Sequence, residues 1–196
     1  DSNPTEANPL VRQWADDMAF LLDTMADWNA EAGHGLNGRF DFSHVGIFGH
    51  STGGGATLQF CLQDERCQAG VGLDSWVLPV GDGVLTQGPA QPFMFIGTPE
   101  WLGDTNKARG EAIFSGLTQD SYNLILANTA HYDFTDLALL SPLTPQLGLS
   151  GTIDSHYSAE IQIEYLLAFF NHTLKGAATP LLDAPSPYPE LTIERN

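Results

Sequence analysis

Four apolar runs of strand length alternate with stretches of helical character along this chain. The runs lie at residues 45–48, 69–73, 92–97 and 122–127. Such alternation favours a parallel sheet, because the crossover between two parallel strands lays a helix on a face of the sheet. We therefore expect an α/β fold of one domain, with a parallel sheet that carries helices on both faces.

Helices are expected around and between these runs. Asn8 and Pro9 form a typical helix start, and apolar side chains then recur at helical spacing for about five turns. Helical stretches follow at residues 52–62, 107–117 and 158–174. The apolar faces of the first and last helices are Val11, Trp14, Met18, Leu21, Leu22, Met25 and Trp28, and Ile161, Tyr165, Leu166, Phe169 and Phe170. The proline-rich tail, residues 176–196, is expected to cross the surface as an irregular strap.

The charge of the chain excludes some classes of partner. With 24 acidic and 7 basic residues, its formal net charge is −17, so its surface repels phosphate backbones and anionic lipid headgroups. No apolar run is long enough to span a bilayer. We expect neither nucleic acid binding nor stable membrane insertion.

The two cysteines, Cys61 and Cys67, lie six residues apart. If the helix between them ends near Asp64, their Cα atoms come close enough for a disulfide, whereas in a continuous helix they point apart. A disulfide favours a secreted or periplasmic protein. Two reduced core cysteines, and with them a cytoplasmic protein, remain the alternative.

The stretch Gly49-His50-Ser51-Thr52-Gly53 joins an apolar run to a helical one. A G-x-S-x-G sequence in this context is typical of a sharp strand-to-helix turn that exposes a nucleophilic serine. Such a turn crowds its neighbours, so we expect Gly49 and Gly53 to be required for their small size. The helix start also directs backbone N–H groups at the same point, so the Thr52 amide is a candidate oxyanion donor.

A nucleophilic serine needs a histidine base, and the base needs a carboxylate. His131 follows the run at residues 122–127 and is expected at the same edge of the sheet as Ser51. His156 is the rival. For the acid, Asp74 follows one strand while Glu100 and Asp104 follow the next, and geometry alone does not choose among the three.

Several motifs together resemble one known family. GHSTGGGAT, GLDSW, PFMFIGTPE, AHYDFTDL and GTID occur in this order, from the first helix almost to the tail. They resemble the platelet-activating factor acetylhydrolase group of α/β-hydrolases. The resemblance implies Ser51 as nucleophile, His131 as base and Asp74 as acid, in preference to Glu100 and Asp104.

The resemblance also implies that part of the usual fold is missing from this chain. The family has about half of its sheet, and a loop that supplies a second oxyanion donor, upstream of the first helix. We therefore expect the C-terminal portion of one α/β-hydrolase domain, with a sheet edge left open at residues 45–48. Pairing of that edge with a second chain, or in a homodimer, is the expected remedy.

These observations predict a serine carboxylic ester hydrolase that works through an acyl-enzyme on short-chain acyl esters or lipids like platelet-activating factor. His50 and Trp76 are assigned to the substrate pocket, with packing at the turn and in the core as alternatives. Neither a metal ion nor an organic cofactor is expected. Two other functions stay open: an inactive hydrolase-like binding module, and a polyester or lipid hydrolase that acts at an interface, which exposed apolar residues around the His131 loop would support. The apolar segment 134–149 is expected to form a wall or cap for an acyl chain, with core packing as the alternative.

Overall fold

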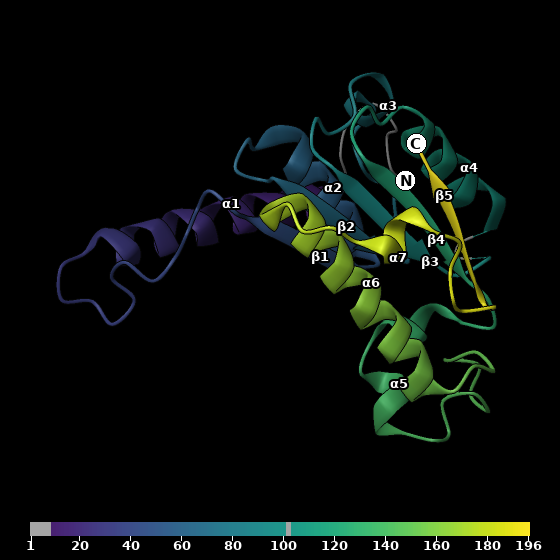
Figure 1. Ribbon diagram of the computed structural model, residues 1–196. Helices are drawn as coiled ribbons and strands as arrows, with labels where there is room; N and C mark the ends of the chain where they lie inside the picture. Colours follow the sequence, from purple (N-terminus) through teal and green to yellow (C-terminus); the bar gives the residue numbers. More distant parts are fainter. Residues whose placement is uncertain (1–8, 101–102) are drawn as a thin grey trace.

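The computed structural model of the chain describes residues 9–100 and 103–196. Its centre is a sheet of five strands in the order β1-β2-β3-β4-β5 (Figure 1). The four predicted strands are all present and run parallel to one another. They are β1 (Gly46–His50), β2 (Ala69–Leu73), β3 (Phe93–Gly97) and β4 (Ser121–Leu126).

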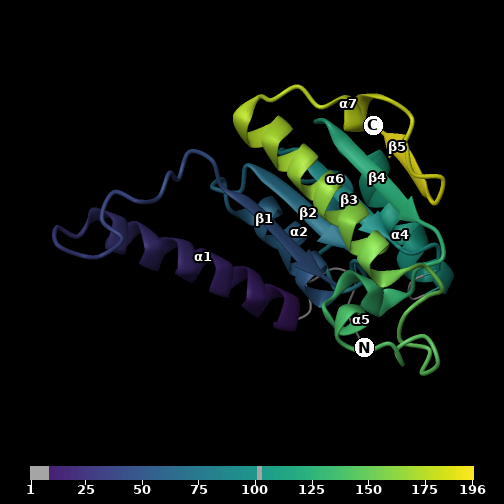
Figure 2. The same cartoon turned by 60° about the horizontal axis from the view of Figure 1, so that its bottom comes forward.

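Helices cover both faces of the sheet, as the alternation predicts. One face carries α1 (Pro9–Ala30), α2 (Thr52–Gln63) and α4 (Gly103–Ser115), together with the short α3 (Gly83–Thr86). The other face carries α6 (Ser155–Lys175), which crosses the strands in Figure 2. The predicted cap residue of α1, Asn8, lies outside the described residues.

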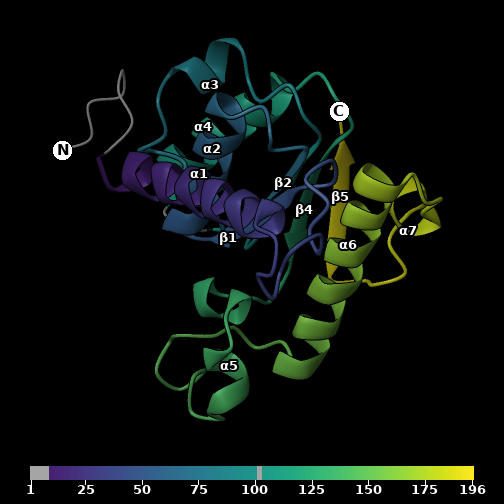
Figure 3. The same cartoon turned by 90° about the vertical axis from the view of Figure 1, so that its left-hand side faces the viewer.

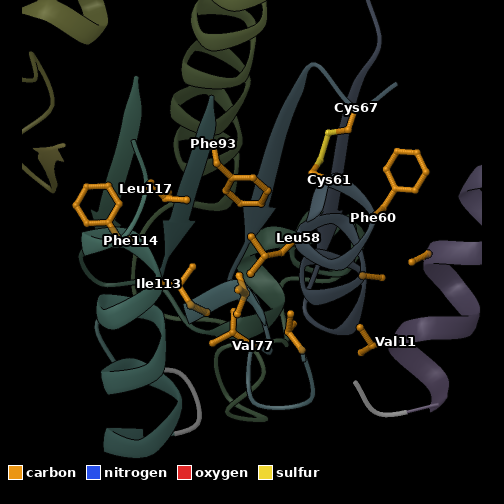
Figure 4. Close-up of a cluster of buried hydrophobic side chains, with 14 of the residues drawn as sticks. Val11, Leu58, Phe60, Cys61, Cys67, Val77, Phe93, Ile113, Phe114 and Leu117 are labelled. Carbon is orange, nitrogen blue, oxygen red and sulfur yellow. A yellow bond between two sulfur atoms is a disulfide. The ribbon is translucent and has the colours of Figure 1, made fainter. Parts of the chain in front are cut away.

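Two hydrophobic cores follow from the alternation of side chains along each strand. In β3, Phe93 points into the core beneath α2 and α4, whereas Met94 and Ile96 pack against the α6 side. Figure 4 shows the first core, with Val11 from α1 and Ile113 from α4 on either side. The buried apolar side chains of α6 are Ile161, Tyr165 and Phe169, all on the predicted face, whose other two members, Leu166 and Phe170, are partly buried.

The proline-rich tail is more regular than expected, and the prediction of an irregular strap is wrong. Residues Pro180–Asp183 form a short helix, α7, and Leu191–Arg195 form β5, which pairs antiparallel with β4. Leu182 and Leu191 are buried in the core on the α6 side. The tail is ordered because it covers the edge of β4 and buries these leucines.

The apolar face of α1 is only partly covered. Val11, Ala15 and Leu22 are buried, whereas Trp14, Leu21 and Trp28 are more than one-third exposed. Beside this face, β1 is the end strand of the sheet. The two elements border an apolar groove of about 480 Å³, which extends along β1 as far as Phe48.

The predicted disulfide is present between Cys61 and Cys67, whose Cα atoms are 5.0 Å apart. The geometry depends on where α2 ends. Its last residue is Gln63, and the Asp64 N–H donates to the Phe60 carbonyl, after which the chain turns back. Within residues 9–100 and 103–196, no helix combines the length and apolarity needed to cross a membrane.

Candidate active site

Ser51 occupies the turn between β1 and α2, with φ 56° and ψ −119°. A positive φ is unfavourable for a residue with a side chain, so this turn is strained as expected. The Ser51 N–H donates to the Leu73 carbonyl of β2 at 2.9 Å, which fixes the turn to the neighbouring strand. Thr52, the candidate oxyanion donor, is the first residue of α2.

Of the two glycines that we expected to be required for their small size, only Gly49 is. A Cβ on Gly49 would collide with the backbone of Gly53. A Cβ on Gly53 would lie 3.9 Å from the Trp14 ring, which is an ordinary contact, so that part of the prediction is wrong. Further steric requirements fall on Gly54, whose Cβ would collide with Ser75, and on Gly55, whose Cβ would collide with the Trp76 carbonyl.

Asp74 follows β2 and is held by three hydrogen bonds. Its N–H donates to the Ile96 carbonyl at 2.7 Å, and its Oδ1 accepts from the Thr98 N–H at 2.8 Å. Its Oδ2 lies 2.7 Å from His131 Nδ1, and the carboxylate is only 2% exposed. A carboxylate in this position orients the ring and stabilises the imidazolium.

The structure thus brings Asp74, of the three acidic candidates, to the predicted base. Glu100 and Asp104 have exposed side chains near the start of α4. The rival base, His156, is also exposed, in the first turn of α6.

His131 begins a short 3₁₀ helix, η1 (His131–Phe134), beyond the end of β4. The carboxylate of Asp133 holds this segment, since its Oδ2 accepts from the N–H groups of Ala130 at 2.7 Å and Gly151 at 2.6 Å. Gln162 of α6 also donates to the Asp133 carbonyl. Asp133 was not predicted from the sequence, where the available signal was an aspartate three residues after the amide that it caps.

His50 lies directly against the predicted base. Its Nε2 is 3.0 Å from the His131 carbonyl, and the two ring centroids are 4.3 Å apart. Burial, reinforced by the nearby His131, lowers the pKa of His50 below its ordinary value of 6.5. A neutral ring with Nε2 protonated can donate this hydrogen bond. The substrate-pocket role predicted for His50 stays a prediction.

Trp76, the other residue assigned to the pocket, is half-buried. Its backbone N–H donates to the Ser51 carbonyl at 2.9 Å, so the residue is linked to the serine turn through its main chain. Its role in a pocket likewise stays a prediction.

A mostly parallel sheet with a serine on a strained strand-to-helix turn, an acid after the next strand and a histidine after β4 defines the chain as an α/β hydrolase. Solved structures agree with this class. The chain matches "Ferulic acid esterase from Streptomyces cinnamoneus" with a TM-score of 0.78 and 26% identity, over 98% of this chain and 57% of that one.

The family model for platelet-activating factor acetylhydrolase, isoform II, matches residues 19–178, and the chain belongs to this family. Platelet-activating factor acetylhydrolase of Cavia porcellus is 30% identical over 141 residues, which are 71% of this chain and 32% of that protein. The Gallus gallus protein of the same name is 27% identical over 156 residues, covering 79% of this chain and 36% of the relative. The chain thus spans about a third of the length of these relatives.

Proposed function

We propose that the chain is the part of a serine carboxylic ester hydrolase that carries the nucleophile, the base and the acid. The observation that carries the proposal is the 2.7 Å contact between His131 Nδ1 and Asp74 Oδ2, at the sheet edge where Ser51 occupies its strained turn. The names of the relatives support an ester as substrate, since they describe an acetylhydrolase and a ferulic acid esterase.

In the proposed reaction, His131 Nε2 takes the proton of the Ser51 hydroxyl while Ser51 Oγ bonds to the ester carbonyl carbon. Collapse of the tetrahedral intermediate breaks the bond to the alkoxy group, which leaves as the alcohol with the proton from His131. Water, deprotonated by the same ring, then attacks the acyl carbon. The bond from that carbon to Ser51 Oγ breaks, His131 returns the proton to Ser51 Oγ, and the carboxylic acid leaves. Asp74 stabilises the imidazolium in both steps.

The oxyanion of each intermediate needs hydrogen-bond donors. We assign one to the Thr52 N–H, because Thr52 begins α2 and follows the nucleophile directly. The positive end of a helix of 12 residues adds to this stabilisation.

The test is hydrolysis of p-nitrophenyl acetate by the wild type and Ser51→Ala, with Ser115→Ala, an exposed serine of α4, as the matched control. We expect turnover in the wild type and in the control, and a loss of at least a thousandfold in Ser51→Ala. Turnover that survives in Ser51→Ala would reject the nucleophile. A wild type that binds esters without turnover would favour the inactive binding module.

A second candidate function, action on lipid or polyester esters at an interface, is favoured by one surface next to His131. Leucines of α5 (Leu137–Leu140) and of the loop after it are exposed: Leu140 by 80%, Leu147 by 68% and Leu143 by 60%. Residues 137–149 contain no charged side chain in a chain of net charge −17. Figure 3 shows this segment projecting away from the sheet.

An uncharged apolar projection beside the base suits contact with an aggregated, uncharged ester. The measurement compares dissolved p-nitrophenyl butyrate with emulsified tributyrin, for Leu140→Ser and for the control Leu167→Ser, an exposed leucine of α6. Leu140→Ser should lose activity on the emulsion and keep activity on the dissolved ester. Equal behaviour of the two variants would reject this candidate.

We also propose that a further strand pairs with β1. Its support is the position of β1 at the end of the sheet and the apolar groove beside it. The strand could come from a longer protein or from a second copy. Phe48→Lys, which puts a charge on this edge, should weaken any self-association seen by sedimentation at rising concentration, whereas an unchanged association would reject β1 as its site.

Export to an oxidising compartment is the proposal for location, and the Cys61–Cys67 disulfide supports it. Protein isolated from its native source with thiols blocked at lysis should contain no titratable thiol from this pair. Two reduced thiols would point to a cytoplasmic protein.

A further inference from the structure

The segment after Asp74 is joined to the serine turn through main-chain hydrogen bonds. Ser51 donates its N–H to the Leu73 carbonyl and accepts at its own carbonyl from the Trp76 N–H, both at 2.9 Å. Ser51 and Asp74 both have positive φ, at 56° and 42°. Strained residues keep such angles only where the surrounding structure holds them. The segment 74–77 therefore contains the acid, Asp74, and also binds the backbone of the nucleophile, Ser51. A shift of this segment would change the positions of both.

The side chain of Asn106, in α4, binds the segment 74–77 through two hydrogen bonds. The Val77 N–H donates to Asn106 Oδ1 at 2.9 Å, and Asn106 Nδ2 donates to the Ser75 carbonyl at 3.0 Å. These two bonds lie on either side of Trp76, whose N–H binds Ser51. Asn106 is only 5% exposed, so water cannot readily replace either hydrogen bond if the side chain is lost.

One turn further along α4, a second side chain continues the same contact. Arg109 donates from Nε to the Val77 carbonyl at 3.1 Å and from Nη2 to the Val80 carbonyl at 2.7 Å. Its guanidinium is also paired with Asp82 at 2.9 Å. The backbone of Val77 is thus bound on both sides, because its N–H donates to Asn106 and its carbonyl accepts from Arg109. These bonds fix the segment 74–77 to α4.

We propose that Asn106 is a positioning residue: from α4, it fixes the segment 74–77 so that Asp74 meets His131 while the Trp76 N–H holds Ser51. This inference rests on the proposed triad. Loss of the Asn106 side chain leaves a buried carbonyl and N–H unpaired, and the segment must move to satisfy them. Asn106 bonds to the backbone of residues 75 and 77, so its loss should lower kcat and leave KM nearly unchanged.

The experiment uses the full chain with Asn106→Ala, with Asn106→Asp, and with Thr105→Ala as an exposed control in the same turn. Two quantities are measured: kcat and KM for p-nitrophenyl acetate, and the low-field proton NMR resonance of His131 Nδ1, which reports its hydrogen bond to Asp74 without turnover. Asn106→Ala should lower kcat about tenfold or more, with KM within about twofold, and should weaken or abolish the resonance. Thr105→Ala should change neither.

Asn106→Asp keeps the shape and the acceptor for Val77, but it replaces the donor to Ser75 with an oxygen that repels the Ser75 carbonyl. It should lower kcat and weaken the resonance as Asn106→Ala does, and it decides the question if near-ultraviolet circular dichroism finds Asn106→Ala unfolded. A kcat within about twofold of wild type with an unchanged resonance, in the folded variant, overturns the inference. A wild type without the resonance also overturns it. A resonance that responds to Asn106 in a chain without esterase activity supports the inference and rejects the proposed function.

Discussion

The imidazole of His50 lies against that of His131, with Nε2 3.0 Å from the His131 carbonyl and ring centroids 4.3 Å apart. The residue next to the proposed nucleophile therefore also contacts the proposed base. The contact joins the last residue of β1 to the segment after β4, and the two histidines are 81 residues apart in sequence.

The first prediction concerns this hydrogen bond. His50→Phe keeps an aromatic ring but removes the donor. We expect the transition state to lose about 0.5–1.5 kcal/mol of stabilisation, which lowers kcat/KM roughly two- to tenfold. His50→Gln, which retains a side-chain N–H, should recover part of the loss. Ester hydrolysis by the three proteins checks this, and equal rates for both variants and the wild type would count against a role of the bond.

The second prediction concerns stability and pH. The pKa of His50 is lowered in the folded chain, mainly by burial, from an ordinary value of 6.5. The unfolded chain therefore binds a proton more readily, and folding stability should fall as the pH drops below about 6.5 and towards the lower folded pKa. Thermal unfolding between about pH 5 and pH 8 should show a smaller acid loss in His50→Gln than in the wild type. Parallel curves would contradict the assignment.

The third prediction separates the acid from its alternatives. Asp74→Asn keeps the shape of the side chain but removes the charge beside His131, so kcat should fall by about 10⁴. Glu100→Gln and Asp104→Asn, which change exposed carboxylates, should leave kcat within about twofold. Steady-state kinetics of the three variants is the measurement, and a large loss in either control would transfer the acid role away from Asp74.

The fourth prediction uses two neighbouring glycines of α2. A Cβ on Gly54 would lie 2.9 Å from the Ser75 Cβ and 3.0 Å from the Gly49 carbonyl, so Gly54→Ala should cost about 1–3 kcal/mol of unfolding free energy. Gly53→Ala meets only an ordinary contact with Trp14 and should be within about 0.5 kcal/mol of wild type. Denaturant unfolding of the two variants measures both, and the reverse order would refute the steric argument.

The fifth prediction concerns the disulfide. Cys61 and Cys67 close a short loop at the end of α2, so the entropy model assigns the bond about 2 kcal/mol of stability. The double variant Cys61→Ser, Cys67→Ser should lose about that amount, and esterase activity should persist, because the pair lies at the opposite end of α2 from Ser51. A loss of activity in a folded double variant would show that the prediction is wrong.

The strands and the serine turn were predictable because their signals are local. β1 to β4 coincide with mainly apolar runs, and Ser51 lies in a G-x-S-x-G motif between such a run and a helical one, although only Gly49 of its two glycines is required for small size. The choice of Asp74 was different. Three carboxylates follow neighbouring strands, and only the family resemblance separated them before the structure placed Asp74 beside His131.

Other features could not be predicted because they depend on distant contacts. β5 lies in the proline-rich tail, and its pairing with β4 depends on the uncovered edge of that strand rather than on its own sequence. Nothing in the sequence distinguishes Asn106 from other polar residues of a helix, because its role depends on the packing of α4 against the segment 74–77. Gly54 is required for its small size because of Ser75, which lies 21 residues further along the chain.

The two ends of the sheet differ in a way that limits how copies of this chain can assemble. β5 ends in the charged residues Glu194 and Arg195, which discourage addition of another strand, whereas β1 lies beside an apolar groove. We therefore expect no growth in both directions, as a fibre needs. If two copies pair through β1, as proposed above, they should be related by a twofold axis and form a closed dimer.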